Sequence, residues 1–168
     1  LLLQETYPSW LYPVKMGATT IWERWDGIKP DSTFQTPGMN SFNHYAYGAI
    51  GDWMYRMIAG IDTYDDGVGY KHIKIKPTIG GSLKYASASL QTYYGKVSSG
   101  WKLEGDKVIL DIEIPSNTIA SVYIPASSKE SVTENGNTLS ADSKIITAEN
   151  GYVGLQLGSG RYHFEAKK

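Results

Sequence analysis

The second half of the chain contains short runs in which apolar and polar residues alternate, and this pattern limits the fold more than any other feature. In residues 108–114, Leu110, Ile112 and Ile114 alternate with acidic side chains, and Pro115 stops the run. Alternation of this kind gives a strand one apolar and one polar face. Similar runs occupy residues 72–76, 119–124, 144–148, 152–157 and 162–166, with Gly, Asn and Ser between them. About eight short strands over about 100 residues predict an antiparallel, jelly-roll-like β-sandwich.

The first part of the chain differs in composition, because all four Met and four of the five Trp residues precede residue 62. Apolar residues at three- and four-residue spacing predict a long helix over residues 41–60, capped by Asn40 or Ser41 and ended by Gly60. Two shorter helices are predicted over residues 8–16 and 18–25. The sequence thus predicts an α+β chain with helices in residues 1–61, a linker at 62–69 and the sandwich at 70–168.

Composition also excludes several classes of function. The formal net charge is -1 and no block of basic residues occurs, so nucleic acid is not expected as a partner. The absence of cysteine rules out disulfides, thiolate metal sites and a cysteine nucleophile. No apolar run reaches the roughly 18 residues that a membrane helix needs. These observations leave the compartment open, whether periplasmic, extracellular or cytoplasmic.

Two further segments bear on the organisation of the chain. Residues 1–6 resemble the tail of a helix rather than the start of a gene product, so we expect a piece of a longer protein. Asp62, Asp65 and Asp66 precede Gly67, but their spacing does not match the calcium loop of an EF-hand. We interpret this cluster as a turn between domains and expect no metal site.

The first motif with chemical potential is Gly-Ala-Thr-Thr-Ile-Trp-Glu-Arg-Trp-Asp-Gly, at residues 17–27. In a helix, Trp22 and Trp25 would share one face and Glu23 would lie on another. Aromatic rings can cover the apolar faces of a sugar while a carboxylate transfers protons. The alternatives are that the Trp residues fill a core and that Glu23 pairs with Arg24 at the surface.

The second motif is Asn-Ser-Phe-Asn-His-Tyr-Ala-Tyr-Gly-Ala, at residues 40–49. Asn43 and His44 would lie in the first turn of the predicted long helix, where polar groups can face a site bounded by helix ends. The alternative is that Asn40 or Ser41 caps the helix and His44 makes a structural hydrogen bond.

Together and in this order, the two motifs resemble the end of the catalytic domain of glycoside hydrolase family 78, the inverting α-L-rhamnosidases. The resemblance covers residues 1–61 and continues more loosely into the second half, as at residues 100–106. It implies the last helices of an (α/α)6 barrel followed by a C-terminal β-sandwich. It also implies that Glu23 is the general base and that His44 contacts the sugar, with Trp22 and Trp25 as walls of the site.

The resemblance further implies a substrate class and a missing partner. The substrate would be a rhamnose-containing oligosaccharide, polysaccharide or glycoside, and cleavage would need no cofactor. An inverting glycosidase uses two carboxyl groups about 6.5–9.5 Å apart. The general acid lies upstream in such enzymes, so we expect this piece alone to be inactive and to self-associate through exposed helices.

Two rival functions place the sandwich at the centre. In one, it is a carbohydrate-binding module that uses Tyr93, Tyr94 and Trp101 as a sugar-binding surface. In the other, it is a structural cap that shields the end of the barrel, with Trp101 buried. Exposed aromatic side chains on the sandwich would favour the first.

Overall fold

The computed structural model describes residues 2–167. The chain divides into two compact units, Leu1–Gly51 and Asp52–Lys168, called here the N-terminal unit and the sandwich unit. No helix among the described residues is long and apolar enough to cross a membrane.

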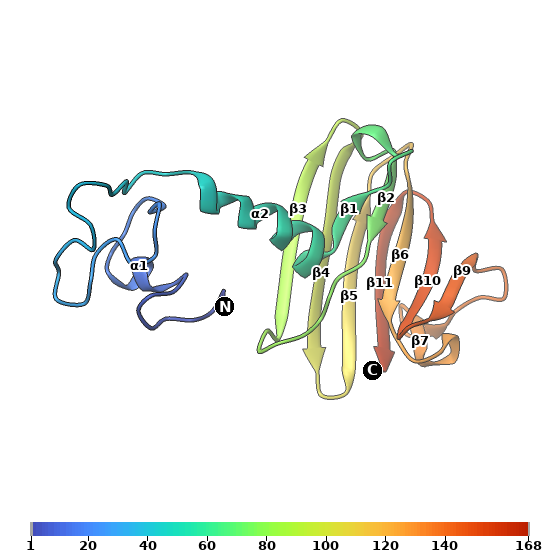
Figure 1. Cartoon of the computed structure of the whole chain (residues 1–168). Helices are drawn as coiled ribbons and strands as arrows, with labels where there is room; N and C mark the ends of the chain where they lie inside the picture. Colours follow the sequence, from blue (N-terminus) through green and yellow to red (C-terminus); the bar gives the residue numbers. More distant parts are fainter. Residues whose placement is uncertain (1, 168) are drawn as a thin grey trace. The chain divides into compact units, whose positions relative to one another are not determined.

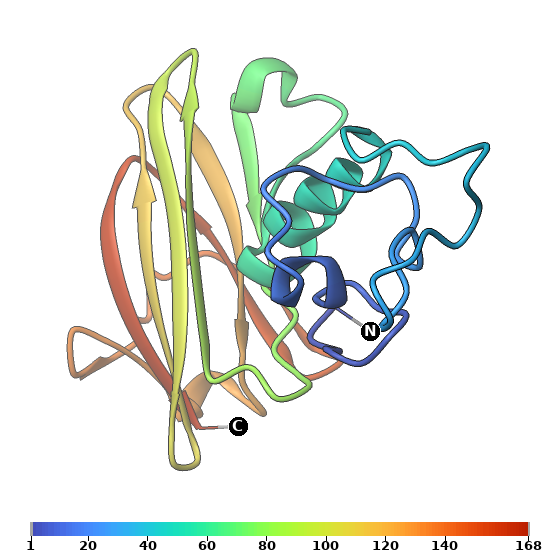
Figure 2. The same cartoon turned by 90° about the vertical axis from the view of Figure 1, so that its left-hand side faces the viewer.

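The sandwich unit contains two β-sheets (Figures 1 and 2). The first has the strand order β1-β2-β6-β10-β9 and the second the order β3-β4-β5-β11-β7-β8. The strands are β1 (Ile61–Thr63), β2 (His72–Ile75), β3 (Tyr85–Thr92), β4 (Gly95–Glu104), β5 (Lys107–Ile114), β6 (Ile119–Pro125), β7 (Val132–Glu134), β8 (Asn137–Thr138), β9 (Ile145–Glu149), β10 (Tyr152–Leu157) and β11 (Gly160–Lys167). Neighbouring strands are antiparallel, except that β2 runs parallel to β6.

The alternating residues of the sequence form the core between the sheets. In β5, Leu110, Ile112 and Ile114 are buried, whereas the acidic residues between them are not. Phe164 of β11 pairs with Leu110 across the six-stranded sheet and is completely buried. Burying an apolar side chain of this size contributes about 1.5–3 kcal/mol. The core therefore stabilises the sandwich unit from within its own residues.

The prediction of helices followed by an antiparallel sandwich is confirmed, with more strands than expected. The strand β3 was not predicted because its alternating residues are mostly Ala and Ser, which carry little hydropathic contrast. Part of the expected linker at residues 62–69 is also ordered: β1 pairs with β2, and a 3₁₀ turn, η3, follows at Val68–Tyr70. The domain division at residue 61 stays a prediction.

The helices are shorter than the sequence indicated. The first is α1 (Tyr12–Lys15), and a second run comprises the 3₁₀ helix η1 (Ala46–Ala49), α2 (Ile50–Trp53) and the π-helix η2 (Met54–Ala59). Gly60 ends this run at φ 81°, a left-handed conformation that glycine adopts without strain.

Two helix predictions in the N-terminal unit are wrong. Residues 18–25 form turns and extended segments, and the long helix begins at Ala46 rather than at residue 41. Tyr45 occupies the N-cap position, without a side-chain cap, so neither Asn40 nor Ser41 caps this helix. The physical reason is a long-range pairing between the two motifs, which takes up backbone groups that a helix would have used.

Candidate active site

The two motifs of the N-terminal unit lie side by side through their backbones. The amide of Glu23 donates to the carbonyl of Ser41 at 2.9 Å, and the amide of His44 donates to the carbonyl of Ile21 at 2.8 Å. These two hydrogen bonds join the two motifs along one edge, with Glu23 opposite Ser41 and His44 opposite Ile21, and neither Glu23 nor His44 is helical. Sequence spacing alone did not predict this pairing.

The carboxylate of Glu23 is partly exposed. Within residues 2–167 it makes no hydrogen bond or ion pair with another side chain. Arg24 does not pair with it, because the guanidinium donates to both carboxylate oxygens of Asp26, at 3.1 and 3.2 Å. The alternative in which Glu23 forms a surface ion pair with Arg24 is therefore not observed, because Asp26 forms that ion pair.

The hydrogen bonding of the His44 imidazole indicates which of its two ring nitrogens donates. Its Nδ1 accepts a hydrogen bond from the amide of Ala46 at 3.2 Å, and its ring stacks on Tyr45 at 5.5 Å. A neutral imidazole that accepts at Nδ1 carries its proton on Nε2. His44 can thus present an N–H group to a hydroxyl or carboxylate oxygen.

Trp22 lies beneath this edge. Its side chain is only 6% exposed, and its ring contacts Phe42 edge-on at 5.3 Å between centroids. Because the residues on either side of Trp22 are not helical, Trp22 and Trp25 do not share a helix face as the sequence predicted.

Trp25 belongs to a separate aromatic cluster. Its ring stacks on Tyr47 at 5.1 Å, and Trp10 contacts these two rings edge-on at 5.8 and 5.4 Å. The buried Trp25 Nε1 has no hydrogen-bond partner among the described residues. Buried indole N–H groups normally have a partner, so the Trp25 Nε1 is an unsatisfied donor inside this cluster. Sequence reasoning missed Trp10 because it precedes the motif and reaches it only through the fold.

The sandwich residues suggested as a sugar surface separate into two kinds. Trp101 is 2% exposed, and its Nε1 donates to the carbonyl of Ile58 at 2.7 Å, so it cannot stack on a ligand. Tyr93 is 93% exposed, and Tyr94 is half-buried beside it. Only the tyrosines remain candidates for ligand binding.

Part of the aspartate cluster at residues 62–66 is engaged in ion pairs. Asp62 pairs with Arg56 at 3.0 Å and with Lys74 at 3.8 Å, so cationic side chains already neutralise it. Within residues 2–167 no group of three potential ligands could hold a metal ion.

Comparisons with known proteins agree with this organisation. Residues 1–58 match the family model of the bacterial alpha-L-rhamnosidase 6 hairpin glycosidase domain, and residues 60–139 match that of the bacterial alpha-L-rhamnosidase C-terminal domain. Among curated proteins, the chain is 44% identical over 164 residues to an alpha-L-rhamnosidase of Streptomyces avermitilis, covering 98% of the chain and 15% of that protein. It is also 44% identical over 169 residues to an alpha-L-rhamnosidase of Formosa agariphila, covering 99% of the chain and 18% of that protein.

A solved structure gives the same result. The crystal structure of the Streptomyces avermitilis alpha-L-rhamnosidase complexed with L-rhamnose superposes with a TM-score of 0.87 at 43% identity, covering 99% of this chain and 16% of that one. These relatives place both units in the glycoside hydrolase class. The chain belongs to the bacterial α-L-rhamnosidase family, and it spans 15–18% of the length of the curated relatives.

Proposed function

We propose that the chain supplies the general base of an inverting α-L-rhamnosidase, and that Glu23 is this base. The observation that carries the proposal is the backbone pairing that joins the motifs of Glu23 and His44, together with a Glu23 carboxylate that has no side-chain partner within residues 2–167. A partner-free carboxylate can accept a proton, whereas one held in an ion pair with arginine is less basic. The relatives named α-L-rhamnosidases supply the substrate class.

In the proposed reaction, Glu23 takes a proton from a water molecule. That water attacks the anomeric carbon from the face opposite the leaving group, so the configuration inverts. A second, protonated carboxyl gives its proton to the departing glycosidic oxygen. The two carboxyl groups stand about 6.5–9.5 Å apart to leave room for the water. We infer that the second carboxyl comes from a part of the enzyme that this chain does not contain.

The remaining residues of the edge would bind the sugar and position Glu23. His44 would donate its Nε2 proton to a sugar hydroxyl or to Glu23, because Nδ1 is already occupied. Trp25 and Tyr47, whose rings stack on each other, would form an aromatic wall of the site. The burial of Trp22 favours a supporting role, in which it holds the backbone of Glu23 in place. None of these steps needs a cofactor.

The test is the substitution Glu23→Gln in the full-length enzyme that contains this chain. The change keeps the side-chain volume but removes the base, so the turnover number should fall by about 10²–10⁴-fold with little change in KM. Azide should restore part of the turnover, because it attacks without losing a proton. Near-normal turnover of the variant would end the assignment.

Two controls sharpen this measurement. Glu5→Gln is the matched exchange in the same unit; Glu5 is an exposed partner of Lys15, so turnover should not change. The 168-residue chain alone should release no nitrophenol from a nitrophenyl rhamnoside, because it lacks the general acid. Robust release by the chain alone would show that the acid lies within it.

A further inference from the structure

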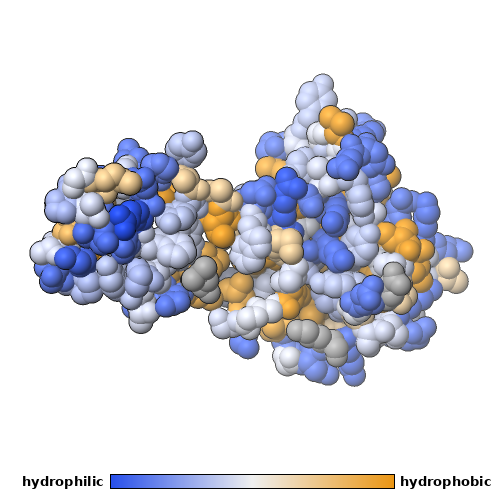
Figure 3. Space-filling model, viewed as in Figure 1, coloured by the Kyte–Doolittle hydropathy of each residue, from blue (hydrophilic) through white to orange (hydrophobic). Residues whose placement is uncertain are grey.

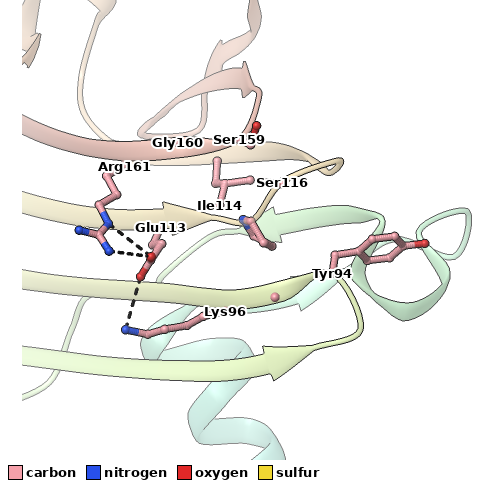
Figure 4. Close-up of a pocket in the computed structure, with 10 residues that line it drawn as sticks. Tyr94, Lys96, Glu113, Ile114, Ser116, Ser159, Gly160 and Arg161 are labelled. Carbon is pink, nitrogen blue, oxygen red and sulfur yellow. Dashed lines mark hydrogen bonds and ion pairs between the residues drawn. The ribbon is translucent and has the colours of Figure 1, made fainter.

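A polar groove lies at one end of the sandwich unit, and it is lined by residues of that unit alone. Its lining comes from the β3–β4 turn, the ends of β4 and β5, the turn after β5 and the start of β11 (Figure 4). Its volume is about 500 Å³, within the range of small-ligand sites. The groove can therefore accommodate one or two sugar rings.

Three charged side chains on adjacent strands form one wall. Arg161 of β11 donates to Glu113 Oε1 of β5 through Nε and Nη2, at 3.3 and 3.1 Å. Lys96 of β4 approaches Glu113 Oε2 at 3.4 Å. Figure 4 shows Glu113 between the two cations. The Arg161 hydrogen bond, followed by that of Lys96, holds the pKa of Glu113 below its ordinary value, so the carboxylate is ionised near neutral pH.

This wall keeps one uncompensated positive charge, because two cations surround one carboxylate and the other lining residues are uncharged. The side chain of Arg161 is 83% exposed, and Glu113 fixes one edge of its guanidinium. The remaining N–H groups face solvent, and a guanidinium held in this way suits a planar carboxylate. The charge of the groove thus favours an anion with a single charge.

The rest of the groove offers sugar-type contacts. Tyr94 stands at one end of the groove, and Lys71 covers one side of its ring at 5.0 Å. The hydroxyls of Ser116 and Ser159 lie along the lining. An aromatic ring, hydroxyls and a cation around a shallow groove match a sugar ring that carries a carboxylate.

We propose that this groove binds a uronic acid residue of an acidic polysaccharide, as an accessory site independent of Glu23. Arg161 and Lys96 would bind the carboxylate of the sugar, Glu113 would hold both cations in place, and Tyr94 at the end of the groove would contact the sugar ring. The sandwich unit would then retain the enzyme on an acidic polysaccharide while catalysis proceeds elsewhere.

The test is calorimetric titration of the 168-residue chain with trigalacturonate and, as the neutral comparison, with galactotriose. We expect trigalacturonate to bind with a Kd of about 0.1–1 mM, near −4 to −5.5 kcal/mol, and galactotriose to bind at least about tenfold more weakly. Trigalacturonate binding should weaken as salt rises. Equal affinity for the two trisaccharides, or no binding of trigalacturonate, would overturn the proposal.

Single substitutions test which residues of the chain bind trigalacturonate. Arg161→Gln and Tyr94→Ala should each weaken trigalacturonate binding by about fivefold or more. Lys102→Gln is the matched control. Lys102 lies on the same strand as Lys96, about 20 Å from it along the strand, and it pairs with Glu104. Unchanged affinity in Arg161→Gln would overturn the proposal, as would complete displacement of trigalacturonate by equimolar acetate. Neither result depends on turnover, so failure here is distinct from failure of the Glu23 assignment.

Discussion

The two units differ in the size of their buried apolar cores, and therefore in how far their own residues can stabilise them. In the sandwich unit, apolar side chains from both sheets close one buried core. In the described part of the N-terminal unit, the buried hydrophobic side chains are Tyr12 and Trp22, with Pro13 beside them. The proposed catalytic edge thus lies in the unit with the smaller core. This contrast indicates that the sandwich folds on its own residues, whereas the edge of Glu23 depends on additional packing.

The largest expected effect on stability concerns the sandwich core. Phe164→Ala removes the largest fully buried side chain and should lower the free energy of unfolding of the sandwich by about 3–5 kcal/mol. Phe34→Ala is the same exchange in the N-terminal unit, where Phe34 is 52% exposed, and it should cost less than about 1 kcal/mol. Urea unfolding followed by circular dichroism compares them. Equal losses of unfolding free energy in the two variants would contradict the difference in core packing between the units.

A second, intermediate effect concerns association. Apolar residues of the N-terminal unit reach the surface (Figure 3), including Val14 at 63% and Met39 at 55% exposure. Exposed apolar patches of a few hundred Å² normally mark interfaces. The chain should therefore self-associate at high concentration, and Val14→Lys with Met39→Lys should reduce this in light scattering. Ile145→Lys in the sandwich unit, where Ile145 is 37% exposed, should not. A monomer at all concentrations would contradict the expectation.

The smallest effect is the response of the sandwich to acid. Ion pairs with Arg161 and Lys96 lower the pKa of Glu113, and pairing with Lys107 lowers that of Glu165. A carboxyl with a lowered folded-state pKa stabilises the fold above its unfolded value, about 4.3, and this contribution is lost as the pH falls through the folded value. Between pH 6 and pH 3, Tm should fall less in Glu113→Gln than in the original chain. An identical pH dependence would show that the pair is not formed in solution.

The sequence predicted those parts of the fold that local patterns determine. The strand β5 was predictable because large apolar residues alternate with acidic ones, whereas in β3 Ala86 and Ala88 alternate with Ser87 and Ser89 and give too weak a signal. The helix predicted at residues 18–25 was wrong because hydrogen bonds to residues 41–44 compete with it, and no local pattern reveals these.

The candidate sites, like the fold, could be predicted only where a local sequence pattern indicates them. The motifs pointed to Glu23 and His44 as candidates, but the contact between the two motifs depends on backbone pairing across about 20 residues of sequence. The groove of the sandwich unit was not predictable, because Arg161 of β11 lies far in the sequence from Lys96 and Glu113 of the consecutive strands β4 and β5. Tyr93 and Tyr94 were noticed only as adjacent aromatic residues.

Hydrogen–deuterium exchange on the 168-residue chain, resolved to single amides, compares the units most directly. Core strand amides exchange only when a unit unfolds, whereas amides in weakly packed segments exchange through local opening. We therefore expect strong protection in β5 and β11, with opening free energies close to that of global unfolding. The hydrogen-bonded amides of Glu23 and His44 should exchange through openings of about 0–2 kcal/mol. Protection at Glu23 and His44 equal to that of β5 would contradict the view that the proposed catalytic edge needs packing from outside this chain.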